Sequence, residues 1–390
     1  MLFGIQAGQS VVLSRIAREL DEGILLKKTE ERLSRHLLAD GLDRMVQDAV
    51  LAHGAGKVAD DDIVSIDPSD VQKPYAHEDG MPLLAKVRDG SKGRVGDNLG
   101  YNLYFATATP SMSRRIVPLH MTMWSAREEG FTSENDKVLD AVRTVANALE
   151  KRGICVYDRG GDGDWLFDFF VKERLDFIVR LVGDRHLLHW NGRRLAADLA
   201  ETCEMKYRDR VTFKSHGKER EVPIEYGSIP VRLPEHPAVE LRLVVVKWPK
   251  CEKPMMLLTT LRAARSRKSL RQVVDGYLTR WRVEETIRFV KQAYEVEDVR
   301  LLRFDRLRAM VAIVLATAYF AMAWLGLGDK LAVLADHVKR VSKRMFDVPD
   351  FFFYAIADGL RTLFSRHGRW NALDGPDKEP KEPCQMILAL

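Results

Sequence analysis

Two short apolar runs, each ending in an aspartate, constrain the fold of this chain most strongly. Residues 63–66 are rich in β-branched side chains and lead directly into Asp67, after which Pro68 indicates that an inner strand ends. Residues 154–157 form a second run of this kind and lead into Asp158. The sequence therefore predicts two strands with a carboxylate at the end of each.

Helical segments separate and follow these strands. Residues 133–152 place apolar side chains on one helical face, with Ser133 as a capping residue and Gly153 after the last turn. A further helix at about 163–174 is followed by a strand at 177–181. This alternation of strands and helices predicts a mixed α/β sheet with acidic residues at strand ends.

The composition is that of a folded protein in a reducing compartment. The chain has 390 residues, of which 46% are hydrophobic, and its 61 basic and 56 acidic residues give a net charge of +5. Its four cysteines form no C-x-x-C pair, which argues against a disulfide framework and a sulfur-rich zinc site. The first twenty residues lack the features of a secretory signal, so we expect a cytoplasmic protein.

Residues 309–328 carry no charge and reach the length of a membrane-spanning helix. Six alanines and two glycines make this run less apolar than a span of leucine and isoleucine. We therefore expect a buried core helix, with membrane attachment as the alternative.

Shifts in pattern divide the chain into five regions. The first is helical and basic, and for it DNA contact and a solvated charged face remain alternatives. The regions are an N-terminal helical DNA-binding domain at 1–58, the first part of the core at 59–181, a β-rich insertion at 182–255, the second part of the core at 256–330, and a C-terminal helical region and tail at 331–390.

The helix predicted over 276–291 carries one stripe of polar side chains. At about 100° per residue, its members fall within an arc of about 80°. They are Tyr277, Arg280, Glu284, Arg288 and Lys291. One carboxylate among cations suits a surface that handles phosphates. The alternative is a surface ion-pair stripe, because Arg280 and Glu284 are four residues apart.

Three carboxylates are candidates for a shared site: Asp67, Asp158 and Glu284. At one sheet edge they would repel each other unless divalent cations lay among them, and carboxylate oxygens suit Mg²⁺ or Mn²⁺. The pattern therefore predicts a two-metal site for in-line displacement at phosphorus. Neighbouring carboxylates remain alternatives to the two aspartates: Asp70 for Asp67, and Asp162 or Asp164 for Asp158.

The spacing in the stripe resembles that of a known family, the DDE transposases of bacterial insertion sequences, of the insertion-sequence family 4 type. Its signature Y-x2-R-x3-E-x6-K is matched by Tyr277, Arg280, Glu284 and Lys291. Segments 66–71 and 156–162 are similar to the two acidic strands of that family, and 257–260 looks like the strand before its glutamate helix. The resemblance covers about residues 60–330.

This resemblance implies a ribonuclease-H-like catalytic core with an inserted mostly-β subdomain and flanking helical domains. It implies that Asp67, Asp158 and Glu284 bind two Mg²⁺ ions, for which Mn²⁺ can substitute. The implied reaction cleaves transposon ends and joins them to target DNA by a cut-and-paste route with a hairpin intermediate. The implied partners are double-stranded DNA, at terminal inverted repeats and target, and a second copy of the chain in a synaptic complex, without a membrane.

Cationic and aromatic side chains are expected to contact DNA. The stripe and its neighbourhood provide Tyr277, Arg280, Arg288, Lys291 and Arg159. A further basic helical face provides Lys339, Arg340, Lys343 and Arg344. For that face a solvated surface is the alternative.

One position departs from the family pattern. Members that form hairpins usually present a tryptophan just before the strand at 257–260, and here that position is Met255. Trp190 and Trp248 in the insertion are other candidates for stacking on a base. The alternative function is a domesticated or inactive DNA-binding protein that keeps the transposase fold.

Overall fold

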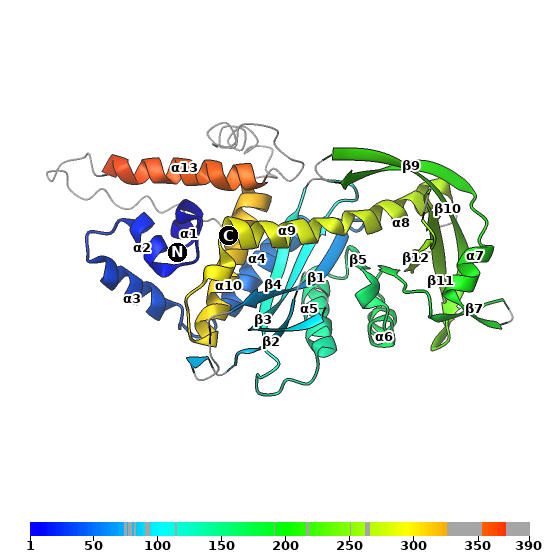
Figure 1. Cartoon of the computed structure of the whole chain (residues 1–390), viewed down its shortest axis with the longest axis horizontal. Coiled ribbons are helices and arrows are strands. Elements are labelled where there is room, and N and C mark those ends of the chain that lie inside the picture. Colours follow the sequence, from blue (N-terminus) through cyan, green and yellow to red (C-terminus); the bar gives the residue numbers. More distant parts are fainter. Residues whose placement is uncertain are drawn as a thin grey trace.

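A large mixed sheet forms the centre of the molecule, as the alternation of strands and helices predicts. The computed structural model describes residues 1–73, 76, 80, 81, 83–89, 94–113, 115–190, 192–215, 218–249, 251–261, 266–325 and 353–371. In this part of the chain twelve strands join in one sheet, with the order β2-β3-β1-β5-β6-β12-β11-β10-β7-β8, while β4 pairs with β3 and β9 pairs with β10. Figure 1 shows the sheet in the middle and at one end of an elongated molecule, with helices at the other end.

The strands have the following bounds: β1 Ile63–Gln72, β2 Ala85–Asp89, β3 Arg94–Thr109, β4 Val117–Trp124, β5 Ile154–Tyr157, β6 Phe177–Arg180, β7 His186–His189, β8 Gly192–Leu195, β9 Tyr207–Ser215, β10 Lys218–Leu233, β11 His236–Lys247 and β12 Met255–Thr259. Strands β1, β5 and β6 are parallel to each other, whereas β12 runs antiparallel to β6.

The prediction that a strand ends at Asp67 is wrong, because β1 continues through Pro68 to Gln72. The reason lies in the pairing of β1. It pairs with β3 along its whole length but with β5 only from Ile63 to Ser65. At Pro68 the strand is therefore unpaired on its β5 side, where proline is tolerated. The pairing of β1 with β5 ends at Ser65 and Val156, so β1 is unpaired on this side at Asp67.

Alternating residues of the central strands pack into two apolar layers on opposite faces of the sheet. One layer contains Ile63, Ile154 and Ile178, together with residues of helix α8, Arg267–Thr279. The other contains the intervening strand residues with helices α5, Glu134–Ala148, and α6, Asp164–Glu173. As predicted, Ser133 caps α5, its hydroxyl accepting from the backbone N of Asp136 at 3.1 Å.

The strands of the predicted β-rich insertion continue the central sheet. Strand β12 pairs with both β6 and β11, so β11, β10, β7 and β8 extend the central sheet outward. The insertion also contains a helix that the alternation of its sequence did not indicate, α7, Ala196–Thr202. Two arginines of α8 donate hydrogen bonds to β9. Arg267 Nη2 donates to Asp209 Oδ1 at 2.6 Å, and Arg271 Nη1 donates to the carbonyl of Arg210 at 2.8 Å.

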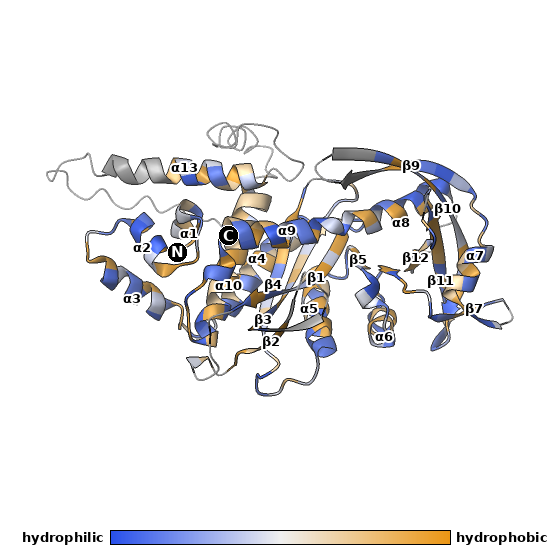
Figure 2. Cartoon of the chain, in the orientation of Figure 1, coloured by the Kyte–Doolittle hydropathy of each residue, from blue (hydrophilic) through white to orange (hydrophobic). Residues whose placement is uncertain are grey.

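The uncharged segment forms a core helix as far as it is described. Helix α10, Phe304–Tyr319, continues as the π-helical turn η4, Phe320–Trp324. Among the described residues this is the one helical segment long and apolar enough to cross a membrane, and 78% of its most apolar window is buried in the protein. Figure 2 shows apolar residues along α10 and in the strands, whereas hydrophilic residues are frequent on α9, Trp281–Ala293.

The remaining helices gather at the end of the molecule away from the insertion (Figure 1). They are α1 Leu2–Gly8, α2 Leu13–Leu20, α3 Leu26–His36, α4 Leu42–Ala55 and α13 Phe353–Asn371. Two short helical turns lie elsewhere in the described residues: η2 Arg159–Gly161 after β5, and η3 Val296–Asp298 after α9. Buried Gln6 of α1 joins α13 to the end of α9, because its Nε2 donates to the carbonyl of Ala357 and its Oε1 accepts from the hydroxyl of Tyr294. The N-terminal and C-terminal helices thus pack as one group against the end of α9.

Candidate active site

Strand alternation places both predicted aspartates on the face of the sheet that α8 covers. Asp67 follows Ile63 by four residues, and Asp158 follows Ile154 by four residues, so each shares the face of an isoleucine in the α8 layer. Ser65 pairs with Val156 across the parallel strands, and extending this register by two residues aligns Asp67 with Asp158. Two residues 91 positions apart are thereby aligned just beyond the end of the pairing between β1 and β5.

The predicted helix over 276–291 is two helices that meet at Arg280, with α8 before it and α9 after it. Arg280 itself keeps right-handed helical angles, so the axis continues almost straight (Figure 1). Gly276 allows α8 to approach the sheet, because a Cβ atom there would lie 2.9 Å from Ile63 Cδ1 and 3.1 Å from Ile178 Cδ1. This close packing brings the start of α9 over β1.

The guanidinium of Arg280 lies between two of the candidate carboxylates. Its Nη2 donates to Glu284 Oε1 at 2.5 Å, and its Nη1 is 3.5 Å from Asp67 Oδ1. The side chain of Arg280 is 12% exposed, and its Nε is buried with no hydrogen-bond partner among the described residues. Asp67 and Glu284, far apart in the sequence, therefore share one buried cation.

Burial and neighbouring charge perturb Asp67. Loss of solvent raises the pKa of Asp67 to about 7, and the nearby carboxylates of Glu284 and Asp158 raise it as well, while Arg280 opposes the shift. The contributions of Glu284 and Asp158 mean that all three candidate carboxylates lie within electrostatic range. Arg280 by itself does not balance the charge of three ionised carboxylates.

The donor set suits a hard divalent cation, because carboxylate oxygens are the ligands that Mg²⁺ and Mn²⁺ prefer. In the arrangement described here, no group of three or more His, Cys, Asp or Glu side chains in the described part of the chain converges closely enough to hold an ion. Instead, the charge between Asp67 and Glu284 is supplied by Arg280. Asp67, Asp158 and Glu284 are thus suitable ligand types for a metal ion, and in this arrangement Asp67 and Glu284 bind the guanidinium of Arg280.

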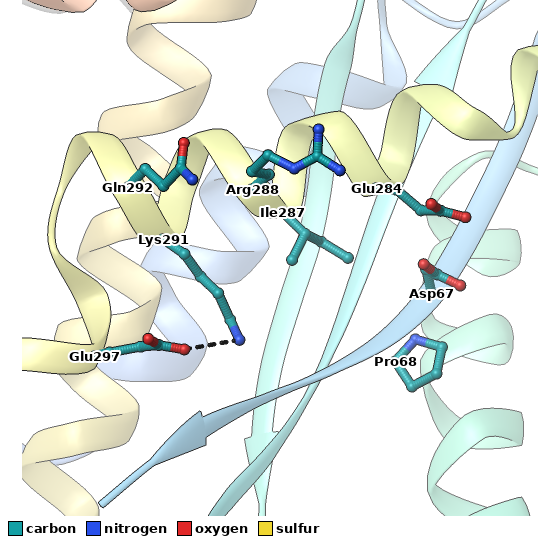
Figure 3. Close-up of a pocket in the computed structure, with 8 residues that line it drawn as sticks. All are labelled: Asp67, Pro68, Glu284, Ile287, Arg288, Lys291, Gln292 and Glu297. Carbon is teal, nitrogen blue, oxygen red and sulfur yellow. Dashed lines mark hydrogen bonds and ion pairs between the residues drawn. The ribbon is translucent and has the colours of Figure 1, made fainter. Parts of the chain in front are cut away.

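A pocket of about 340 Å³ opens beside this cluster. Figure 3 shows Asp67 from β1 and Glu284 from α9 at one end of it and Lys291 near Glu297 at the other. Lys291 Nζ donates to Asp70 Oδ1 at 2.9 Å and to Glu297 Oε1 at 3.1 Å. Arg288 also lines the pocket and is exposed, without an ion-pair partner in the described residues. The pocket thus has carboxylates at both ends and cations along α9.

The aromatic member of the stripe, Tyr277, faces Arg180, a residue that the sequence pattern did not single out. Tyr277 is only 8% exposed, and its hydroxyl accepts from Arg180 Nη1 at 3.4 Å, with the guanidinium carbon 6.0 Å from the ring centre. Arg180 ends β6, and Tyr157 pairs with Val179, so the register aligns Arg180 with Asp158. Its position directly after the buried run 177–179 was the signal available in the sequence.

The alternative carboxylates have other partners. Asp162, whose side chain is 2% exposed, accepts from the backbone N of Val182 at 2.7 Å and pairs with Arg185. Asp164 pairs with the same guanidinium at 2.6 Å. Asp70 is bound to Lys291, as described above. These contacts hold the start of the insertion and the middle of α9, whereas Asp67 contacts Arg280, which also binds Glu284.

The other expected DNA contacts are less closely grouped. Arg159 is exposed at the start of η2. Met255 is 3% exposed in β12, whereas Trp190 is 81% exposed at the turn between β7 and β8. The basic face formed by Lys339, Arg340, Lys343 and Arg344 lies outside the described residues.

The fold and this site define an α/β protein that gathers carboxylates and cations on one face of a mixed sheet. The chain belongs to the transposase DDE domain family, whose model matches residues 127–321, a segment that includes Asp158 and Glu284. A cryo-EM structure of the piggyBac transposase synaptic complex with hairpin DNA is similar with a TM-score of 0.41 and 12% sequence identity. That match covers 81% of this chain and 55% of the piggyBac chain, so this chain spans about half of its length. No curated protein matches the chain.

Proposed function

We propose that this chain is a metal-dependent DNA transposase of the insertion-sequence family 4 type with a ribonuclease-H-like core. It would cleave the phosphodiester at transposon ends and join the freed 3′-OH to target DNA by a cut-and-paste route. The observation that carries the proposal is the meeting of Asp67 and Glu284 around Arg280, with Asp158 close enough to raise the pKa of Asp67. The family match at residues 127–321 supports it.

In this proposal Asp67, Asp158 and Glu284 would hold two Mg²⁺ ions, or Mn²⁺ in their place. When bound, such ions supply the positive charge that activates an attacking oxygen and stabilises the leaving one. Arg288 is exposed at the pocket and can bind a DNA phosphate directly. Lys291 can bind one after it leaves Asp70 and Glu297, and Arg180 can orient a phosphate next to Asp158.

The proposed partners are the terminal inverted repeats, target DNA and a second copy of the chain, in the bacterial cytoplasm. The proposed cut-and-paste route includes a DNA hairpin at the transposon end as an intermediate. Because Met255 is buried, base stacking in that step would fall to an exposed aromatic such as Trp190.

The test is cleavage of a duplex that carries the inverted repeats flanking the gene, in the presence of Mg²⁺. We expect Asp67→Asn, Asp158→Asn and Glu284→Gln to bind the duplex and to lose cleavage by at least about a hundredfold. Asp162→Asn is the matched control, because this carboxylate binds Arg185 and Val182 instead. It should keep cleavage per folded molecule. An active Glu284→Gln would contradict the assignment.

A wild-type chain that binds the repeats without cleaving them would favour the inactive DNA-binding alternative. Denaturing gels of the same reactions address the hairpin. A product of doubled strand length would support that intermediate, and open ends alone would remove it from the proposal.

A further inference from the structure

Both ends of the cationic stripe on α9 are neutralised by the chain's own carboxylates. Arg280 is bound between Asp67 and Glu284, and Lys291 is bound between Asp70 and Glu297. Arg288, between them in sequence, has no such partner among the described residues. The two bound cations differ in one respect, because only Arg280 is held by carboxylates that are candidates for metal ligands.

A DNA phosphate and a divalent cation would therefore bind opposite sides of the same ion pairs. The phosphate would bind Arg280, and the cation would bind Asp67 and Glu284. A divalent cation needs the oxygens of Asp67 and Glu284, which Arg280 now occupies at 3.5 Å and 2.5 Å. A DNA phosphate needs a guanidinium that is not already bound to carboxylates. The burial of Arg280, 12% exposed and without an acceptor for its Nε, makes the pair costly to break unless both sides find new partners.

We propose that Arg280 is a positioning residue that couples the two ligands of the site, so that a divalent cation and a DNA phosphate each strengthen the binding of the other. This inference rests on the proposed function. In the free chain Arg280 holds Asp67 and Glu284 together. When a divalent cation takes these carboxylates, Arg280 is released toward the phosphate, and a phosphate that draws Arg280 away leaves the carboxylates for the cation.

The coupling must be reciprocal, because it is a free energy shared by two binding equilibria. The factor by which the cation tightens DNA binding therefore equals the factor by which DNA tightens cation binding. Arg288 and Lys291 contribute to DNA affinity without contributing to this factor. Lys291 binds Asp70 and Glu297, which are not the carboxylates that the cation takes, and Arg288 has no carboxylate partner among the described residues.

The experiment measures both affinities in the full chain. Fluorescence anisotropy gives the Kd for a labelled duplex carrying the inverted repeats, in EDTA and in Ca²⁺ at constant ionic strength, and isothermal titration calorimetry gives the Kd for Ca²⁺ with and without that duplex. For the wild type we expect Ca²⁺ to tighten DNA binding by about 5-fold to 50-fold, with an equal effect of DNA on Ca²⁺ binding. In Arg280→Gln both factors should fall to less than about twofold.

Arg288→Gln is the matched control, because it removes a pocket cation that no carboxylate holds. It should weaken DNA binding equally with and without Ca²⁺ and leave the factor unchanged. If Arg280→Gln does not fold, as judged by circular dichroism, Arg280→Lys replaces it as the variant. Lysine keeps the charge but cannot bridge both carboxylates, so the factor should fall.

Two results would overturn the inference. One is a wild-type chain that binds both ligands independently, and the other is an Arg280→Gln chain that keeps the wild-type factor. A wild-type chain that binds neither the duplex nor Ca²⁺ would instead contradict the proposed function, and the inference with it.

Discussion

Lys291 on α9 and Asp70 on β1 are 2.9 Å apart and join the helix that carries Glu284 to the strand that carries Asp67. The pair connects residues 221 positions apart in the sequence, and both side chains are largely shielded from solvent. Lys291 also binds Glu297, and Arg280 binds Glu284 of the same helix. Substitutions at these ion pairs should change the stability of the chain and its affinity for DNA.

Replacing Asp67 with asparagine should stabilise the chain in the absence of divalent ions, by an amount that depends on pH. The folded-state pKa of Asp67 is about 7, well above the value of about 4 for an unfolded aspartate. Proton binding favours the fold, so this stabilisation is complete below about pH 4 and is lost as the pH rises to about 7. Asp67→Asn mimics the neutral form, and its advantage should reach at most about 4 kcal/mol above pH 7.

Urea unfolding of wild type and Asp67→Asn between pH 4 and 8 measures this difference. Asp140→Asn, on the exposed surface of α5, is the control and should show no comparable trend. A wild-type chain as stable as Asp67→Asn at pH 8 would contradict the perturbed pKa.

Replacing Glu297 with glutamine should strengthen DNA binding, because it releases Lys291 from one of its two carboxylates. We expect the Kd to fall about twofold to fivefold at low salt and the difference to shrink as salt is added. Glu285→Gln changes the net charge equally but breaks a pair with Arg282 instead. Anisotropy titrations should therefore separate the two variants, and identical affinities would count against a DNA contact by Lys291.

Replacing Arg180 with glutamine should slow cleavage more than it weakens binding. Its guanidinium lies against Tyr277 and aligns with Asp158, so its loss removes a charge next to the proposed reaction centre. We expect single-turnover cleavage to slow by about tenfold to a hundredfold. Tyr277→Phe keeps the ring and removes only the hydroxyl acceptor, so its effect should be smaller. Equal rates for wild type and Arg180→Gln would exclude this role.

Replacing Gly276 with leucine should destabilise the chain by about 1–3 kcal/mol, because the larger side chain would collide with Ile63 and Ile178. Gly192→Leu is a suitable control, since nothing lies within 4 Å of a Cβ atom there. Thermal unfolding of both variants measures the difference. Comparable melting temperatures would mean that α8 is not seated on the sheet as closely as the structure has it.

Local pattern was sufficient to predict the parts of the site that depend on one segment at a time. The apolar runs 63–66 and 154–157 marked the aspartates that follow, and helical spacing placed Arg280 and Glu284 on one stripe. The path of β1 through Pro68 was not predictable, because it depends on which neighbour strand is present at that residue. The partners of Lys291 and Arg180 are equally non-local, and no spacing rule connects them to their contacts.

The predicted boundary between the insertion and the second core segment lies at the start of β12, Met255–Thr259. That β12 joins β6 to β11 could not be predicted from the sequence, because it depends on strand pairing. Helix α7 is too short for periodicity to reveal it.

Helices α8 and α9 form a nearly straight rod whose first turn is fastened to β9 by Arg267 and whose second half carries Glu284 (Figure 1). These two residues are about 25 Å apart along the helical axis. A tilt of about 2° at the β9 end would thus shift the glutamate by about 1 Å, a displacement that can change a reaction rate by about a hundredfold. The position of Glu284 consequently depends on how β9 holds the start of α8, at the opposite end of the two helices.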